Sequence, residues 1–198
     1  KKKSILALVL IIKEQLFMKF LTLLISVKTI IAFIGITIST QAFSQETSTN
    51  KVSEKTDWAV FVEELPAKQC WATTKPSEPS KNTKNGMRVN VKRGDIQLYV
   101  MYQPSDDVKG QISFTGGYPF AKDSSVTLNI DGKDFFLLTA DEWAWAESDE
   151  QDALIIAAMK KGSKAVLTAK SSRGTRTQDT FSLLGFTAAI EDAEKRCK

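Results

Sequence analysis

The chain has 198 residues with 27 basic and 23 acidic side chains, a formal net charge of +4, two cysteines and no histidine. Without histidine, neither Ser-His-Asp nor Cys-His catalysis nor a histidine-ligated metal site can be built, and two cysteines alone cannot hold a zinc ion. The sequence has no phosphate-binding P-loop and no GxGxxG motif, so we expect no catalytic residue, no metal and no cofactor.

The first 44 residues have the composition of a leader. From Met18, a short basic start precedes an apolar core over about residues 29–38 and the small-residue tripeptide Ala42-Phe43-Ser44. This order is typical of a secretory signal peptide and predicts a translation start at Met18 and cleavage after Ser44. Residues 20–39 are also about long enough to span a bilayer, so an uncleaved membrane anchor is the alternative.

The basic charge belongs to this leader. It holds six lysines and one acid, so the residues after position 44 carry 21 basic and 22 acidic side chains, a net charge of −1. We therefore expect no nucleic-acid partner, and contact with a membrane only through an uncleaved leader. Export predicts a periplasmic location, with the outer membrane or the cell surface as alternatives.

Residues 45–56 are polar and lack aromatic side chains, which predicts a flexible tether. The remaining residues, 57–198, are enough for a single domain with a hydrophobic core. Its first two predicted strands are "WAVFVEE" and "KQCWATT", the second carrying Cys70. A loop with two prolines follows and ends in Asn85-Gly86, a turn signal.

The next stretches have strand-like patterns separated by turn signals. Residues 87–93 and 96–102 are predicted to form a hairpin around Gly94-Asp95. The strongest hairpin signal is "SSVTLNI", Asp131-Gly132, "KDFFLLT", because Asp-Gly tolerates the positive φ of a type I′ turn. Two more strands are expected within residues 164–185, around a Ser-Ser-Arg-Gly turn.

One internal helix interrupts the strands. Ser148 is a predicted N-cap with Gln151 three residues later, which is a capping box. Acidic residues fill the first turn, Lys160 and Lys161 the last, and Gly162 follows as a stop signal.

A second helix is predicted at the C-terminal end. Phe186, Ile190, Ala193 and Cys197 recur at spacings of four, three and four, which places them on one helical face. In an oxidising compartment, Cys197 and Cys70 are predicted to form a disulfide, with two free buried thiols as the alternative. A bridge that closes so long a loop stabilises the fold by about 4–5 kcal/mol in the chain-entropy model. The total of eight to nine short strands and two short helices predicts an all-β sandwich or barrel.

An acidic cluster surrounds the start of the internal helix, and it suggests a calcium site or a carboxylate pair for glycoside hydrolysis. Its spacing matches no calcium loop, and favourable helix-dipole electrostatics explains the acids in the first turn. We favour the electrostatic explanation. The members are Asp141, Glu142, Glu147, Asp149, Glu150 and Asp152.

Arg93, Gly94 and Asp95 spell RGD, a tripeptide that integrins recognise at the tip of a tight loop. The predicted hairpin would present it there, and adhesion through this loop is one hypothesis. Ordinary turn chemistry at Gly-Asp is the favoured explanation.

Trp143 and Trp145 lie on one face if their segment is a strand, and with nearby aromatic residues they could form a ligand surface. Packing between sheets is the commoner fate of such side chains and is the favoured prediction. The other aromatic residues considered are Tyr99, Tyr102, Tyr118 and Phe120.

The chain from about Trp58 onward resembles the invasion-associated locus B family of exported bacterial proteins. The resemblance rests on "WAVFVEE…QCWA", "VTLNIDGKDFFLLT", "DALIIAAMKKG" and above all "FSLLGFTAAIEDAEKRC". It implies an immunoglobulin-like β-sandwich in the periplasm or cell envelope of Gram-negative bacteria, in a family named for host-cell invasion and without established enzymatic chemistry. Many members have a further cysteine pair where this chain has "TADEWAWAES".

We therefore expect a non-catalytic exported envelope protein with a binding or structural role and an unidentified envelope component as partner. The sequence does not define an oligomeric state. The first alternative is a surface adhesin or invasion factor that uses the loop at Arg93-Gly94-Asp95. The more remote alternative is a carboxylate-based hydrolase built on the acidic cluster.

Overall fold

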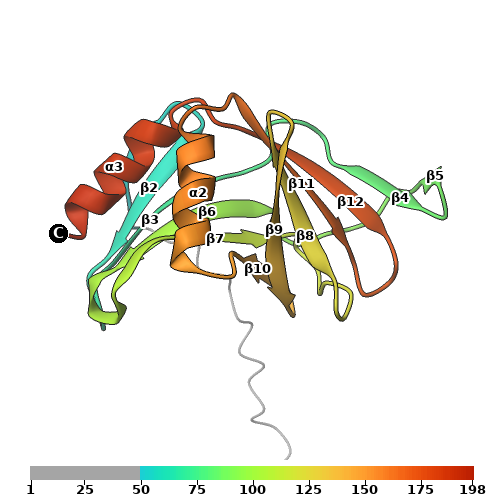
Figure 1. Cartoon of the computed structure of the whole chain (residues 1–198), viewed down its shortest axis with the longest axis horizontal. Coiled ribbons are helices and arrows are strands. Elements are labelled where there is room, and N and C mark those ends of the chain that lie inside the picture. Colours follow the sequence, from blue (N-terminus) through green and yellow to red (C-terminus); the bar gives the residue numbers. More distant parts are fainter. Residues whose placement is uncertain (1–49) are drawn as a thin grey trace, which may run out of the picture. The chain divides into compact units, whose positions relative to one another are not determined.

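The computed structural model describes residues 50–198, which form a β-rich unit with two helices (Figure 1). The predicted signal peptide, its cleavage site and the first five residues of the predicted tether lie outside the described residues. Within residues 50–198, no helix is both long enough and apolar enough to cross a membrane.

The first half of the unit consists of strands β1 (Lys51–Lys55), β2 (Trp58–Glu63), β3 (Gln69–Thr74), β4 (Lys81–Lys84), β5 (Met87–Arg88), β6 (Gln97–Gln103) and β7 (Val108–Thr115), with the short 3-10 helix η1 (Pro104–Asp106). The second half consists of β8 (Ser125–Ile130), β9 (Lys133–Ala140), β10 (Trp143–Trp145), α2 (Asp149–Met159), β11 (Lys164–Lys170), β12 (Arg176–Ser182) and α3 (Phe186–Arg196).

All twelve described strands belong to one antiparallel sheet with the order β1-β2-β3-β6-β7-β10-β9-β8-β11-β12-β4-β5. The sheet bends so that strands far apart in this order meet across the core. The Phe114 ring on β7 lies 6.1 Å from the Phe181 ring on β12, and the Trp58 indole on β2 donates to the carbonyl of Ser182 at 3.0 Å. The mostly β architecture is confirmed, but hydrogen bonding runs through one continuous sheet instead of the two sheets of the expected sandwich.

Both helices pack on the inner face of the bent sheet. The buried face of α3 lies against β2 and β3, where the rings of Phe186 and Trp58 meet edge to face with their centroids 4.9 Å apart. Helix α2 packs against β7 and buries Ile155 and Met159. The alternation of buried and exposed residues along β6, β8 and β11 fills the rest of the core, as the period of a strand requires.

Several predicted elements are confirmed. The Ser148 hydroxyl accepts from the amide of Gln151, and the Gln151 side chain accepts from the amide of Glu147, so the capping box forms almost as predicted. The β8–β9 turn has positive φ at Asp131 (46°) and Gly132 (96°), as a type I′ turn requires.

Three predictions about the first half are wrong. Residues 51–55 of the predicted tether form β1, because their backbone pairs with β2 and β1 also packs against α3. The predicted hairpin of residues 87–93 with 96–102 does not form, because β5 ends at Arg88 and pairs with β4. The predicted loop before Asn85-Gly86 contains β4, so the strand count exceeds the eight to nine expected.

Candidate functional site

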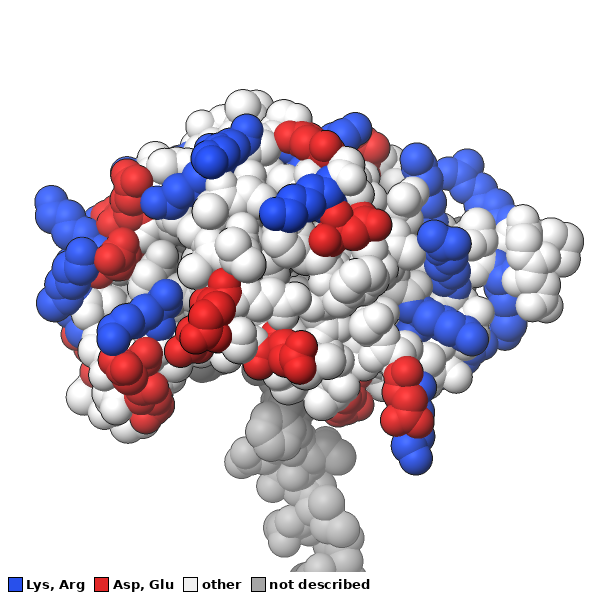
Figure 2. Space-filling view, in the orientation of Figure 1, with Lys and Arg blue, Asp and Glu red and all other residues white. Residues whose placement is uncertain are grey.

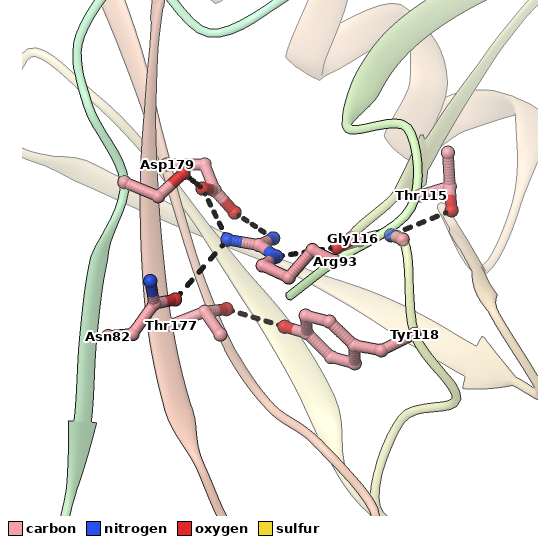
Figure 3. A network of polar contacts seen from close by, with 9 residues as sticks. Asn82, Arg93, Thr115, Gly116, Tyr118, Thr177 and Asp179 are labelled. Atoms are coloured by element: carbon pink, nitrogen blue, oxygen red, sulfur yellow. Dashed lines mark hydrogen bonds and ion pairs between the residues drawn. The ribbon is translucent and has the colours of Figure 1, made fainter. Parts of the chain in front are cut away.

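The side chain of Arg93 points into the fold, where it holds a buried ion pair (Figure 3). Its Nη2 and Nη1 atoms donate to the two carboxylate oxygens of Asp179 at 2.7 and 2.8 Å, and the two side chains are 6% and 0% exposed. The Nε atom donates to the carbonyl of Gly116 at 2.8 Å, and the guanidinium lies over the ring of Tyr118. A receptor that reads Arg-Gly-Asp needs an exposed arginine, so the structure removes the basis for adhesion through Arg93.

We call this set of contacts the Arg93 clasp: Arg93, Asp179 and their partners Ser80, Asn82, Gly116 and Tyr118. It joins the segment before β6 to the turn after β7 and to β12. Gly94 and Gly117 make the close approach possible, since the amide of Gly94 donates to the carbonyl of Gly117 at 2.9 Å. A Cβ on Gly117, whose φ is +71°, would lie 2.5 Å from the carbonyl oxygen of Gly94. The clasp is therefore structural.

The predicted disulfide between Cys70 and Cys197 is confirmed. The Cα atoms lie 5.8 Å apart, and the bond joins β3 to the C-cap of α3 across 127 positions of sequence. Both cysteines are buried. The bond therefore fixes the end of α3 to the sheet.

A groove of about 550 Å³ lies beside the disulfide, between α2, α3 and the β6–β7 hairpin. We call it the helix groove. Its apolar wall includes Ile156, Ala157 and Ile190, and its rim carries Lys109, Lys160 and Lys198 together with Asp107 and Glu194. No local pattern in the sequence predicts this groove, because its residues come from three distant segments of the chain.

Tyr102 belongs to the wall of the helix groove and is 8% exposed. Among the described residues its hydroxyl has no hydrogen-bond partner, and burial, followed by the negative charges of Glu194 and Glu191, raises its pKa to about 12. The phenol therefore stays protonated and can donate a hydrogen bond to a molecule in the groove. The core packing favoured for Tyr102 from the sequence is confirmed, because the residue belongs to the buried core, and it also lines the groove.

The acidic cluster does not converge on one point. Its five other members are exposed, whereas Asp152 is buried and accepts from the amide of Ile112 on β7 at 2.8 Å. Burial raises the pKa of Asp152 to about 6; the hydrogen bond from Ile112 opposes this shift and the charge of Asp149 adds to it. Within residues 50–198, no three His, Cys, Asp or Glu side chains are grouped to hold a metal ion.

The tryptophans of β10 face outward. Ala144 is the buried residue of this strand, while Trp143 is 43% exposed and Trp145 is half-buried, so the core packing favoured for them is wrong. The rings of Tyr99 on β6 and Trp143 lie 5.6 Å apart. Phe120, in contrast, is buried in the core.

Leu138 and Phe136 on β9 continue this outer surface, and we call the five side chains together the aromatic face: Tyr99, Trp143, Trp145, Leu138 and Phe136. Trp145 pairs directly with Leu138, and Phe136 lies two residues further along the same face of β9. The sequence signal was the period-two spacing of the tryptophans, but the pairing with β9 was needed to show how far the face extends.

Comparison with known proteins assigns the family. Residues 58–194 match the family described as invasion associated locus B (IalB) protein. The chain belongs to the IalB family. A crystal structure of invasion associated protein B from Bartonella henselae is similar to this IalB-family chain, with 14% identity and a TM-score of 0.49 over 73% of this chain and 96% of that chain. No curated protein matches it.

Proposed function

We propose that this IalB-family protein is a non-catalytic exported envelope protein that binds another envelope component through the aromatic face. The proposal rests on one observation, which is that large apolar side chains lie next to one another on the outer side of β6, β10 and β9. Phe136 is 57% exposed, Leu138 49% and Trp143 43%. Single exposed apolar residues are common on protein surfaces, but a contiguous group of them marks an interaction site.

The chemistry of the aromatic face fits an apolar protein surface. Aromatic residues are enriched in the centres of protein interfaces, where they bury a large area at a small entropic cost. Ser113 and Thr115 on β7 lie between Tyr99 and the tryptophans in the strand register, and the ring centroids of Tyr99 and Trp143 are 5.6 Å apart, so these two rings are in contact. A partner would therefore pack against the outer surface of these rings.

A site-specific crosslinking experiment tests the binding role. A photo-crosslinking amino acid is placed at Leu138, or at Leu154, a leucine on α2 that is at least as exposed and serves as the control. We expect a defined crosslinked product in the envelope of expressing cells from position 138 only. The product should disappear when Phe136→Ser and Trp143→Ala are added, whereas equal products from both positions, or one that survives these changes, would reject the proposal. A product of twice the monomer mass would identify a second copy of the chain and would also contradict the proposal.

Export is tested separately. We propose that the leader is cleaved after Ser44 and that the product is periplasmic. Osmotic release followed by N-terminal sequencing should give a protein that begins at Gln45. A full-length, membrane-retained chain would establish the anchor instead, and digestion by protease added to intact cells would place the domain on the cell surface.

A further inference from the structure

Eight exposed basic side chains gather at one end of the molecule, over β4, β5 and the end of the β11–β12 hairpin. We call this surface the basic end. Figure 2 shows the blue side chains of Lys and Arg gathered over β4, β5 and β12, at the right of the view. Its members are Lys81, Lys84, Arg88, Lys92, Lys122, Lys170, Arg173 and Arg176.

The basic end is not neutralised by the protein itself. Of the eight ion pairs formed by residues 50–198, seven lie on β1, the β2–β3 connection, the β6–β7 hairpin, α2 and α3, and the eighth is the buried pair of Arg93 and Asp179. No described member of the basic end forms an ion pair. Ion pairs thus link many of the charged side chains on and around α2, α3 and β1, whereas none of them involves the basic end.

The strand register places like charges next to one another. Lys170 on β11 is directly opposite Arg176 on β12, which is opposite Thr83 on β4, which is opposite Arg88 on β5. Like charges in opposed positions destabilise a sheet. Charged side chains on an edge strand protect against aggregation, and this explains Arg88 on β5. It does not explain the pair on β11 and β12, which are interior strands.

The hairpin of β4 and β5 projects from this end (Figure 1). Its turn is Asn85-Gly86, with φ of 52° and 78°, and the next residue, Met87, is 69% exposed. Met87 pairs with Lys84 and is followed by Arg88. Because neighbouring side chains of a strand point to opposite faces, Met87 lies on the face of the hairpin that carries Lys84 and not on the face that carries Arg88.

We propose that the basic end docks on an anionic lipid surface, with the row from Lys170 to Arg88 against the phosphates. Neighbouring strands are about 4.8 Å apart, so the row spans about 15 Å and faces several head groups. The net charge of −1 after the leader gives the protein no overall attraction to an anionic surface. Binding would therefore come from this local patch, because charges beyond about 10 Å are screened at physiological salt.

Sedimentation with vesicles tests the proposal. The exported protein, purified from cells, is mixed with vesicles of phosphatidylglycerol and phosphatidylcholine, or of phosphatidylcholine alone. We expect binding to the anionic vesicles only, with loss at high salt. Arg176→Glu should weaken it by at least about fivefold, because each basic residue near an anionic surface contributes about that factor. Equal binding to the neutral vesicles would overturn the proposal.

The variant Arg176→Glu also separates binding from folding. It replaces the repulsive pair with Lys170 by an attractive one, so we expect the resistance of the protein to urea to stay equal or rise while vesicle binding falls. The control, Lys109→Glu, makes the same charge change on the exposed β6–β7 hairpin and should leave vesicle binding within about twofold of wild type, because the site is remote from the surface. An equal loss in both variants would show a bulk-charge effect and overturn the proposal.

Retention on immobilised heparin, measured beside the vesicle assay, distinguishes a lipid surface from a soluble polyanion. Retention on heparin without binding to anionic vesicles would overturn the lipid proposal and identify a polyanionic polymer as the partner.

Discussion

Arg93 is turned inward because Asp179 is fully buried on β12 and a carboxylate there requires a cation and hydrogen bonds. The pair is bidentate, and a fork of two N–H groups fits a carboxylate in a way that lysine cannot reproduce. The sequence shows the tripeptide, but the partner lies 86 residues away. The tripeptide alone therefore predicted a surface loop, whereas in the structure Arg93 forms the internal clasp with Asp179.

Arg93→Ala should lower the free energy of unfolding by about 3–5 kcal/mol, since it leaves an uncompensated carboxylate in the core. Urea denaturation measures the change. Arg173→Ala, at an exposed arginine without an ion pair, is the control and should have a negligible effect. A small effect of Arg93→Ala would mean that the clasp contributes little to stability.

Asp152 makes stability depend on pH. Its pKa rises to about 6 in the folded protein from an ordinary value of 3.8, so between these values the folded state binds the proton more tightly than the unfolded state. The contribution of this group to stability therefore falls as pH rises from about 4 to 6.

Asp152→Asn keeps an acceptor for the amide of Ile112 and removes the charge. We expect the variant to be more stable than wild type at pH 7.5 by at least about 1 kcal/mol, and the difference to shrink at pH 4. Urea denaturation at both pH values checks this. Glu147→Gln, at an exposed carboxylate, should show neither effect, and a variant less stable at pH 7.5 would contradict the assignment.

At the scale of elements, the start of α3 depends on contact with the β1–β2 turn. Gly185 precedes the helix with a φ of +86°, and a Cβ there would lie 1.9 Å from the carbonyl oxygen of Lys55. The amide of Asp57 donates to the carbonyl of Leu184 in the same contact. The "GF" of the C-terminal sequence signature thus places glycine at the contact and Phe186 in the core.

Gly185→Ala should destabilise the protein by clearly more than Gly174→Ala. Both positions have a positive φ, which costs alanine about 1 kcal/mol, but nothing lies within 4 Å of the Cβ at Gly174. The difference between the two melting temperatures therefore isolates the backbone clash. Equal melting temperatures would show that β1 moves away without cost.

The Cys70–Cys197 disulfide holds the other end of α3, as the contact at Gly185 holds its start. Replacing both cysteines by alanine should lower the free energy of unfolding by about 4 kcal/mol, because the unfolded chain loses a long covalent loop. A reductant should produce a similar loss in wild type and none in the double variant. In the native protein, both cysteines should resist thiol labelling until the bond is reduced.

Over the whole molecule, the sequence predicted what local spacing determines. The capping box at Ser148, the Asp131-Gly132 turn and the face of α3 that carries Cys197 each lie within a few residues and were found. The tether prediction was wrong because β1 is polar and gains its structure from pairing with β2. The helix groove and the opposition of Lys170 and Arg176 depend on strand order, which local patterns do not contain.

The disulfide can form only after Cys197 has been synthesised, because its two cysteines lie far apart in the sequence. Cys70 is synthesised 127 positions before its partner, and the chain has two cysteines, so one intramolecular pairing is available. A chain that stops before residue 197 carries a lone thiol that can couple to another molecule, while a chain that passes it buries both sulfurs. Mobility on a non-reducing gel would therefore separate finished chains from interrupted ones.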